Sequence, residues 1–307
     1  MPDFELITDQ LHFPEGPIAT SSGDVILVEI QAGRLSRVDA KGGVHTVAET
    51  GGGPNGAAVG PDGQVYICNN GGFEWHEIEG MVAPGMQPAN YIGGRIQRVD
   101  PAKGTVTDVY DRVGDHALKG PNDIVFDSAG GFWFTDLGKS RPRDTDHGGL
   151  YYAHPDGSHV EEVVYPLTQP NGVGLSPAGD RVYVAETTPG RVWAWDVAGP
   201  GRVSPAGGGP GGATLLWGFD GYQLLDSLAV DSEGNVCVAT LVTGAVSVIS
   251  PDGKLVDQVH VPEYDVFVTN ICFGGPDLRT AYITSSGRGR LYSTQWPCPG
   301  LKLAHEL

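Results

Sequence analysis

Four oxygen-bearing side chains stand at similar places in short sequence motifs. Glu15 lies in Phe-Pro-Glu-Gly-Pro, Asn122 in Gly-Pro-Asn-Asp, Asn171 in Gln-Pro-Asn-Gly and Asp226 in Leu-Leu-Asp-Ser. Two carboxylates and two amides form an all-oxygen ligand set, which suits a hard cation. The two carboxylates would neutralise a divalent ion and leave positions open for water or substrate. The motifs therefore predict one bound divalent metal ion, with Ca²⁺ favoured and Mn²⁺, Mg²⁺ and Zn²⁺ as alternatives.

A turn is the competing interpretation of these motifs, because Asn-Gly is a strong signal for a β-hairpin. Their recurrence argues for a common role instead. Similar motifs contain Asn55 and Asn270, so six starts lie roughly 40 to 67 residues apart, and such spacing indicates one structural unit repeated along the chain. Glu15 and Asp226 replace Asn at two of the six places, and a tight hairpin turn would not prefer Glu.

Short β-type segments separated by turns with Gly or Asp follow each start. In the second unit, for example, residues 94–100 nearly copy residues 33–39 of the first. No helical period is sustained, and a parallel sheet would need crossover helices. Six units of about four strands predict an all-β chain, a six-bladed β-propeller with a central metal site, as a single domain over residues 1–307. We expect residues 4–7 to pair with the last unit, which is short of an outer strand, and so to close the ring.

In a propeller blade the first strand lines the channel and the second strand returns beside it. The start of strand one and the end of strand two therefore share a rim, where the four candidate ligands would meet. The ends of the second strands add candidates on this rim: Asn69, Asn70, Asp136, Glu186 and Thr240. We expect Asn70, Asp136 and Asn122 to contact the substrate. Residues 73–93 start at this rim, and we interpret them as a lid in which Trp75 contacts the substrate.

The composition narrows the range of partners. With 37 acidic and 19 basic residues the chain has a formal net charge of −18, which repels phosphate backbones and anionic membranes, so we expect neither as a partner. The N-terminus lacks a signal-peptide pattern and the four cysteines lack CxxC spacing, so we expect a cytoplasmic protein with reduced thiols. The oligomeric state is left open. The motifs H-E-x-x-H and G-x-S-x-G are absent, and the Gly-rich residues 199–212 are interpreted as a surface loop.

The motifs taken together resemble one family. FPEGP, GPND, QPNGVGLSP and LLDSLAVDSEGN are similar to segments of the SMP-30/gluconolactonase/LRE-like family of six-bladed propellers, and the resemblance covers essentially the whole chain. It implies a metal-dependent lactonase, a carboxylic ester hydrolase, whose ion is held by Glu15, Asn171 and Asp226, with Asn122 nearby or coordinating. The related diisopropylfluorophosphatase pattern has Glu, Asn, Asn and Asp in the same order. Some animal members carry an Arg where this chain has Gly120, so we expect a lactone less polar than a sugar lactone.

For such an enzyme the expected mechanism is Lewis-acid hydrolysis, in which the ion polarises the lactone carbonyl and a carboxylate takes a proton from the attacking water. Asp226 is the candidate base, and the interpretation that it only binds the metal stays open. Two other functions also stay open. The same site would hydrolyse phosphotriesters or phosphorofluoridates, or the ion would be structural in a non-enzymatic propeller that binds a protein at its rim.

Overall fold

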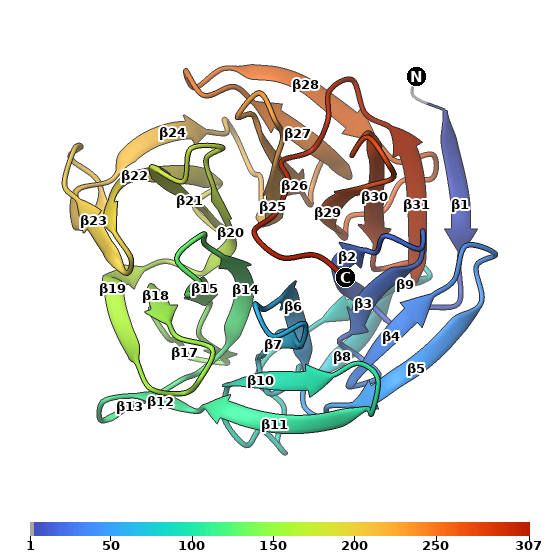
Figure 1. The fold of residues 1–307 in the computed structure, drawn as a ribbon, viewed down its shortest axis with the longest axis horizontal. Coiled ribbons are helices and arrows are strands. Elements are labelled where there is room, and N and C mark those ends of the chain that lie inside the picture. The colour runs from blue at the N-terminus through green and yellow to red at the C-terminus, as the bar shows by residue number, and fades with distance from the viewer. Residues whose placement is uncertain (1–2) are drawn as a thin grey trace.

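Six antiparallel β-sheets are arranged as blades around a central channel in the computed structural model, which describes residues 3–307 (Figure 1). The strands are short runs rich in Val, Ile, Tyr and Trp, residues that favour a half-buried pleated surface. The first strands of neighbouring blades pack against one another all the way round the ring. The prediction of an all-β, six-bladed propeller is confirmed.

The blades follow one another in chain order, and each begins with the strand that lines the channel. Blade 1 comprises β2 (Pro14–Ala19), β3 (Val25–Glu29), β4 (Arg34–Val38) and β5 (Val44–Glu49); blade 2 comprises β6 (Pro54–Val59), β7 (Val65–Asn69), β10 (Arg95–Asp100) and β11 (Thr105–Tyr110). Blade 3 comprises β14 (Pro121–Phe126), β15 (Phe132–Asp136), β18 (Gly148–Ala153) and β19 (Val160–Leu167).

The second half of the ring repeats this plan. Blade 4 comprises β20 (Pro170–Leu175), β21 (Arg181–Glu186), β22 (Arg191–Gly199), β23 (Arg202–Ser204) and β24 (Thr214–Gly218); blade 5 comprises β25 (Leu225–Val230), β26 (Val236–Thr240), β27 (Ala245–Ile249) and β28 (Leu255–His260). Blade 6 comprises β29 (Val268–Gly274), β30 (Thr280–Ser285), β31 (Arg290–Gln295) and β1 (Phe4–Thr8). Three small hairpins lie between strands: β8 (Trp75–Ile78) with β9 (Met81–Pro84), β12 (Arg112–Val113) with β13 (His116–Ala117), and β16 (Ser140–Arg141) with β17 (Asp144–Thr145).

The N-terminal strand closes the ring. β1 pairs antiparallel with β31, so that Phe4 lies opposite Thr294 and Leu6 opposite Tyr292. The Thr294 hydroxyl also donates to the carbonyl of Asp3 at 2.9 Å. The predicted pairing of the N-terminal segment with the last blade is confirmed, and it leaves β31 with no open edge.

Blade 4 departs from the sequence-based expectation. β22 has nine residues against six in β21, so its far end extends past its neighbour and pairs with β23. A 3₁₀ helix, η1 (Pro210–Gly212), follows, and Trp195 Nε1 donates to the Pro210 carbonyl at 3.0 Å. The interpretation of residues 199–212 as a plain surface loop is therefore wrong, because this stretch adds a strand and a helical turn to the blade.

The apolar core lies between neighbouring blades. Between blades 3 and 4, for example, Trp133 and Trp195 are almost fully buried in one cluster with Leu150 and Val184. The four cysteines are free, and three of them are buried, as expected for reduced thiols. No helix among residues 3–307 is both long enough and apolar enough to cross a membrane.

The last residues of the chain cross the end of the channel where the inner strands finish. The Leu301 N–H donates to the Val230 carbonyl at 3.0 Å, and the Ser21 N–H donates to the Leu307 carbonyl at 2.9 Å. The C-terminus accordingly lies near the centre of the ring in Figure 1. A cavity of about 610 Å³ lies between this segment and the inner strands. The starts of the inner strands, with the candidate ligands, face the opposite end of the channel.

Candidate metal and substrate site

Every inner strand has a one-residue bulge at its start. In β20, for example, Pro170 pairs with Glu186 and Val173 with Val184, so Asn171 and Gly172 together lie opposite one residue of β21. The same register shift occurs in the other five blades. We call the second and third residues of each inner strand the first and second bulge positions; in blade 1 Glu15 still pairs with Val28, and the shift falls on the two residues after it. In blade order these positions are Glu15 with Gly16, Asn55 with Gly56, Asn122 with Asp123, Asn171 with Gly172, Asp226 with Ser227, and Thr269 with Asn270.

This register corrects the alignment of the sixth motif. Thr269, and not Asn270, occupies the place that Glu15 has in blade 1, because Val268 pairs with Ser285 as Pro14 pairs with Glu29. Asn270 occupies the second bulge position instead. A bulge sets two side chains against one partner residue and re-aims them locally, so both bulge positions contribute side chains to this end of the channel.

Glycine at the second bulge position allows neighbouring blades to approach closely. A Cβ atom at Gly16 would lie 2.7 Å from the Asn55 carbonyl oxygen, and one at Gly56 would lie 2.5 Å from the carbonyl oxygen of Asn122. Any larger residue would force these strands apart. The motifs thus bring the first bulge positions of successive blades together around the axis.

Hydrogen bonds within and between blades fix these side chains further. Asn270 Nδ2 donates to Glu15 Oε2 at 2.7 Å across the junction of blades 6 and 1. The Gly16 N–H donates to the same oxygen at 2.6 Å. Asn171 Nδ2 donates to the Thr187 hydroxyl at 3.2 Å, and the Ser227 hydroxyl of blade 5 donates to Asn171 Oδ1 at 3.5 Å. The structure therefore joins Asn171 to the residue that follows Asp226 and holds the Glu15 side chain in place.

Several oxygens at this end of the channel are buried and receive no donor. Among residues 3–307 these include Glu15 Oε1, Asn55 Oδ1 and Asn122 Oδ1. A buried acceptor without a partner costs free energy, and buried oxygens of this kind match the ligands that a hard cation takes. The residues present therefore fit a divalent metal ion.

The charges at the site support the same fit. Burial raises the pKa of Glu15 to about 7. Burial and the charge of Glu15 raise the pKa of Asp123 to about 8. Burial, together with the charges of Glu15 and Asp123, raises the pKa of Asp226 well above its ordinary value. Three carboxylates that repel one another, of which Glu15 and Asp123 are buried, would each be stabilised in the ionised form by a nearby cation.

The carboxylates do not form a metal cluster by themselves. Within the part of the chain that the structure describes, no three His, Cys, Asp or Glu side chains gather closely enough to hold an ion. The predicted set has only two carboxylates, Glu15 and Asp226, so the amide oxygens of Asn122 and Asn171 would have to complete the coordination.

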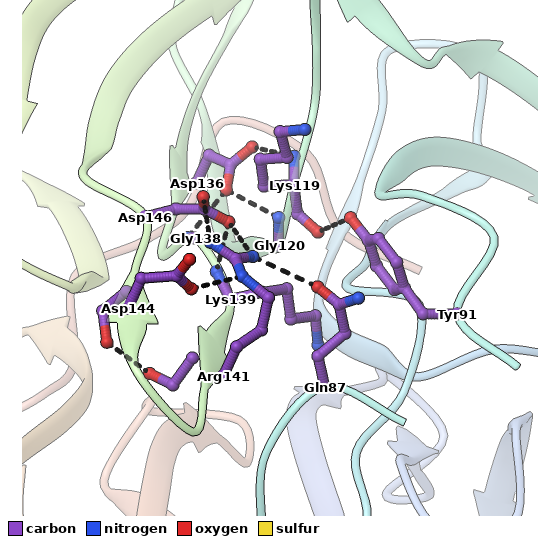
Figure 2. Close-up of polar contacts among 12 residues, drawn as sticks. Gln87, Tyr91, Lys119, Gly120, Asp136, Gly138, Lys139, Arg141, Asp144 and Asp146 are labelled. Atoms are coloured by element: carbon purple, nitrogen blue, oxygen red, sulfur yellow. Dashed lines mark hydrogen bonds and ion pairs between the residues drawn. The ribbon is translucent and has the colours of Figure 1, made fainter. Parts of the chain in front are cut away.

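The carboxylates at the ends of the second strands accept hydrogen bonds from neighbouring loops. Asp136 accepts the backbone N–H groups of Lys119, Gly120 and Gly138 at 2.7, 2.6 and 2.9 Å (Figure 2). Glu186 accepts from the Thr168 N–H at 2.6 Å and Trp193 Nε1 at 2.7 Å. These carboxylates fasten the loop before the inner strand, because the last residue of the second strand points toward that loop. The three N–H donors give Asp136 a structural role, and its contact with substrate stays a prediction.

Other blades have the same kind of hydrogen bond, from the loop before the inner strand to the last side chain of the second strand. Asn69 Oδ1 accepts from the Gly53 N–H at 3.0 Å, and Glu29, which the sequence motifs do not single out, accepts from the His12 N–H at 2.8 Å. Thr240 differs, since its hydroxyl donates to the Ala245 carbonyl within its own blade. The predicted rim candidates Asn69, Glu186 and Thr240 are thus engaged in holding strands and loops.

The residue after each second strand is hydrogen-bonded to the chain just before the inner strand of its blade. We call these six the rim positions: Ile30, Asn70, Leu137, Thr187, Leu241 and Ser286. Each donates its backbone N–H to the carbonyl of the residue just before the inner strand of its blade. The Thr187 hydroxyl contacts the amide of Asn171, and the Ser286 hydroxyl contacts Thr269 at the equivalent place in blade 6. The rim positions therefore lie next to the first bulge positions, and Asn70 is one of them.

Comparison with known proteins decides the family. The model of the SMP-30/Gluconolactonase/LRE-like region matches residues 13–287, a range that contains all six inner strands. The chain belongs to this family.

Individual relatives agree with that assignment. Lactonase drp35 of Staphylococcus saprophyticus is 30% identical over 254 residues, which are 82% of this chain and 70% of that protein. The gluconolactonase structure from Xanthomonas campestris aligns with a TM-score of 0.74 at 22% identity and covers 96% of this chain and 89% of that one. The calcium-binding protein regucalcin from Agrobacterium tumefaciens aligns with a TM-score of 0.76 at 18% identity and covers 100% and 97%. At these identities the two structures show a shared fold.

In this SMP-30/gluconolactonase/LRE-like chain, residues 73–93 extend over the rim. The Val82 N–H donates to the Gly287 carbonyl of blade 6 at 2.8 Å, and the Gln87 N–H donates to the Ser140 carbonyl of blade 3 at 2.9 Å. Trp75 packs on Phe13, which precedes blade 1, with ring centroids 5.1 Å apart. Contacts with the rim loops of three other blades place this segment across the mouth of the channel, as the lid interpretation requires.

Two residues of interest escaped the sequence motifs. Asp123 stands where blades 1, 2 and 4 have Gly, and this replacement within a Pro-Asn motif was a readable signal. Lys139 gave no signal, because it lies in a charged stretch with Arg141, Asp144 and Asp146 that looks exposed. In the structure Lys139 is only 1% exposed, and burial lowers its pKa to about 7.

Proposed function

We propose that this chain is a divalent-metal-dependent hydrolase that opens lactones. The observation that carries the proposal is the combination of mutually repelling carboxylates with buried oxygens that receive no donor among residues 3–307, at one end of the channel. A cation there would give these oxygens a partner of opposite charge. The lactonase and gluconolactonase names of the relatives support the reaction. Ca²⁺ is the favoured ion, supported by the calcium-binding description of regucalcin, with Mn²⁺, Mg²⁺ and Zn²⁺ as alternatives.

The ion would be held by Glu15, Asn171 and Asp226, together with Asn122. When bound, it supplies positive charge that polarises an ester carbonyl. The protein's own contribution is to keep these ligands fixed before substrate arrives, through the hydrogen bonds of Asn270 to Glu15 and of Asn171 to Thr187. Preorganised groups of this kind need not rearrange during the reaction.

Asp226 is the candidate general base. Glu15 and Asp123 are 1% and 6% exposed, whereas Asp226 is partly exposed. Among the three carboxylates Asp226 can therefore meet water in the channel and take a proton from it. Asp226→Asn keeps the shape and removes both the charge and the basic oxygen, so hydrolysis should fall by orders of magnitude with the fold intact. Asp220→Asn, at an exposed loop position, is the matched control.

The decisive experiment combines metal removal with a substrate panel. The purified protein is stripped with chelator and then titrated separately with each of the four ions. Hydrolysis is measured on an aliphatic lactone, γ-phenyl-γ-butyrolactone, glucono-δ-lactone and a phosphotriester. The proposal expects lactone hydrolysis that disappears on stripping and returns with metal. Hydrolysis that is indifferent to exhaustive chelation would contradict it.

Two other outcomes favour the alternatives. Preference for the phosphotriester over every lactone would indicate a phosphotriesterase on the same site. Tight metal binding without turnover of any ester would indicate a propeller whose ion is structural.

A further inference from the structure

Lys139 is a buried lysine whose ammonium group forms no ion pair with a carboxylate of residues 3–307. Nζ donates to the Gly72 carbonyl at 2.6 Å and to Asn70 Oδ1 at 3.2 Å, and it lies 4.0 Å from the centre of the Phe73 ring. It thus joins a loop of blade 3 to the loop that leads from β7 into the lid. Burying a cation costs free energy unless its hydrogen-bond partners are well placed, so the partners of Lys139 bear on its role.

The contact fixes the orientation of the Asn70 side chain. Asn70 Oδ1 accepts from Lys139 Nζ and also from the Gly72 N–H at 2.8 Å. Both partners are donors only, so the atom between them has to be the amide oxygen. The other terminal atom of the Asn70 side chain is therefore the amide nitrogen, Nδ2. Asn70 is 2% exposed, and its Nδ2 is buried without a hydrogen-bond partner among residues 3–307.

The place of Asn70 gives this unpaired donor a use. It occupies the rim position of blade 2, and the equivalent side chains of Thr187 and Ser286 contact the first bulge residues of their own blades. Four buried side-chain nitrogens lack a partner in the described chain: Asn70 Nδ2, Trp217 Nε1, Arg290 Nε and His305 Nε2. Only Asn70 belongs to a rim position. The site therefore has one preset donor beside the candidate metal ligands.

A lactone is the complementary partner for such a donor. Its ester group has two acceptor oxygens and no donor, so recognition through hydrogen bonds has to come from donors of the protein. A buried donor that is satisfied only when the ester is bound favours the ester over compounds that lack an acceptor there.

We propose that Asn70 Nδ2 donates a hydrogen bond to an ester oxygen of the bound lactone, and that Lys139 is a positioning residue that holds the amide in this orientation. The inference rests on the proposed lactone hydrolysis. The surrounding loop keeps Lys139 in place: Arg141 pairs with Asp146 at 2.8 Å, and the Lys139 N–H donates to the same aspartate at 3.1 Å (Figure 2). Gln87 and Tyr91 of the lid bond to this part of blade 3 as well.

Asn70→Asp separates the donor role from a structural one. The carboxylate keeps an acceptor for Lys139 and Gly72 and nearly the same shape, but it has no N–H to offer. We expect kcat/KM for the best lactone of the panel to fall roughly 100-fold, as when a preset donor is removed from other hydrolases. The melting temperature should hold or rise, because Lys139 gains a charged partner. If Asn70 only anchors Lys139, Asn70→Asp should retain activity within about threefold, and that result would overturn the proposal.

The role of Lys139 is tested by a double-mutant cycle. Lys139→Met removes the donor that orients the amide, and we expect a roughly tenfold loss of kcat/KM. Because Lys139 acts through Asn70, the double variant Asn70→Ala/Lys139→Met should be no worse than Asn70→Ala alone. Additive losses would refute the positioning role. Lys254→Met, at an exposed turn, serves as the control. If Asn70→Asp does not fold, Asn70→Ala carries the test: an unchanged kcat/KM would refute the donor.

Failure of the underlying function looks different from failure of this inference. An unmodified protein that hydrolyses no lactone would end both. An active protein whose Asn70→Asp variant keeps its activity would leave lactone hydrolysis standing and remove Asn70 from it.

Discussion

Glu15→Gln should make the metal-free protein more stable at alkaline pH while it abolishes the response to metal. Glu15 Oε2 accepts from the Gly16 N–H and from Asn270 Nδ2, whereas Oε1 has no donor. A glutamine can keep its amide oxygen at the place of Oε2, where the two donors are, and put its NH₂ group at the place of Oε1. The substitution therefore removes a buried charge with little change of shape.

The magnitude follows from the pKa of Glu15, which burial raises from 4.5 to about 7. The folded state holds this proton more tightly than the unfolded state, so the free energy of unfolding falls as pH rises from about 4.5 to about 7. At pH 8 the ionised carboxylate costs about 3 kcal/mol, and at pH 5 less than about 1 kcal/mol. Without metal, Glu15→Gln should recover this difference, which is roughly 5 °C in melting temperature for a chain of 307 residues.

With metal bound, the unmodified protein should become at least as stable as the Glu15→Gln variant. An ion at a hundred times its dissociation constant stabilises the unmodified protein by about 2.7 kcal/mol, and the variant should gain almost nothing. Thermal melts at pH 5 and pH 8, with chelator and with saturating Ca²⁺ or Mn²⁺, give all the values needed. Glu49→Gln, at an exposed position of β5, should behave like the unmodified protein. A Glu15→Gln variant that is no more stable than the unmodified protein at pH 8 in chelator would refute the buried-charge reasoning, and one that metal still stabilises would remove Glu15 from the ligand set.

Three further outcomes are expected. Deleting residues 2–9 removes β1 and exposes the edge of β31, so the melting temperature should fall by about 10 °C or more. An unchanged melting temperature would contradict the role of β1 in closing the ring. Trp75→Ala should raise KM for γ-phenyl-γ-butyrolactone several-fold more than KM for glucono-δ-lactone, because Trp75 contributes apolar surface to the lid; equal changes would argue against this role. Burial lowers the pKa of Lys139 from 10.5 to about 7, so the free energy of unfolding rises between pH 7 and pH 10.5 as the unfolded state alone keeps the proton. Lys139→Met should therefore be more stable than the unmodified protein by about 2 kcal/mol or more at pH 6, and this advantage should fade toward pH 10. A difference in stability that does not change with pH would show that the buried charge is not its cause.

The fold was predictable because its signal is local and repeated. Alternating apolar segments, turns with Gly and a recurrent polar start identify a blade without knowledge of its neighbours. The same logic located Glu15, Asn122, Asn171 and Asp226, since the place of a residue at the start of an inner strand can be read from its own motif. Closure by residues 4–7 was also readable, because the last unit visibly lacked a strand.

The errors arose where the outcome depends on register or on another blade. A bulge moves Asn270 one place out of phase with the motif it resembles, and only the pairing of β29 with β30 reveals this. The place of Asp136 at a strand end could be read from the sequence, but the three backbone N–H groups that donate to its carboxylate could not. Lys139 was not singled out by any motif, and it is buried because a loop of blade 2 covers it. None of these contacts is local in sequence.

The order of residues around the ring explains how three carboxylates can repel one another without forming a cluster. Glu15, Asp123 and Asp226 belong to blades 1, 3 and 5, while the bulge amides Asn55, Asn171 and Asn270 come from blades 2, 4 and 6. Each carboxylate is therefore separated from the next by a blade that supplies an amide. Their charges remain close enough to raise one another's pKa values, but within residues 3–307 no three acidic groups lie close enough to hold an ion. Such an alternation leaves net negative charge around the axis with neutral oxygens between the carboxylates, an arrangement in which a cation on the axis relieves all three repulsions at once.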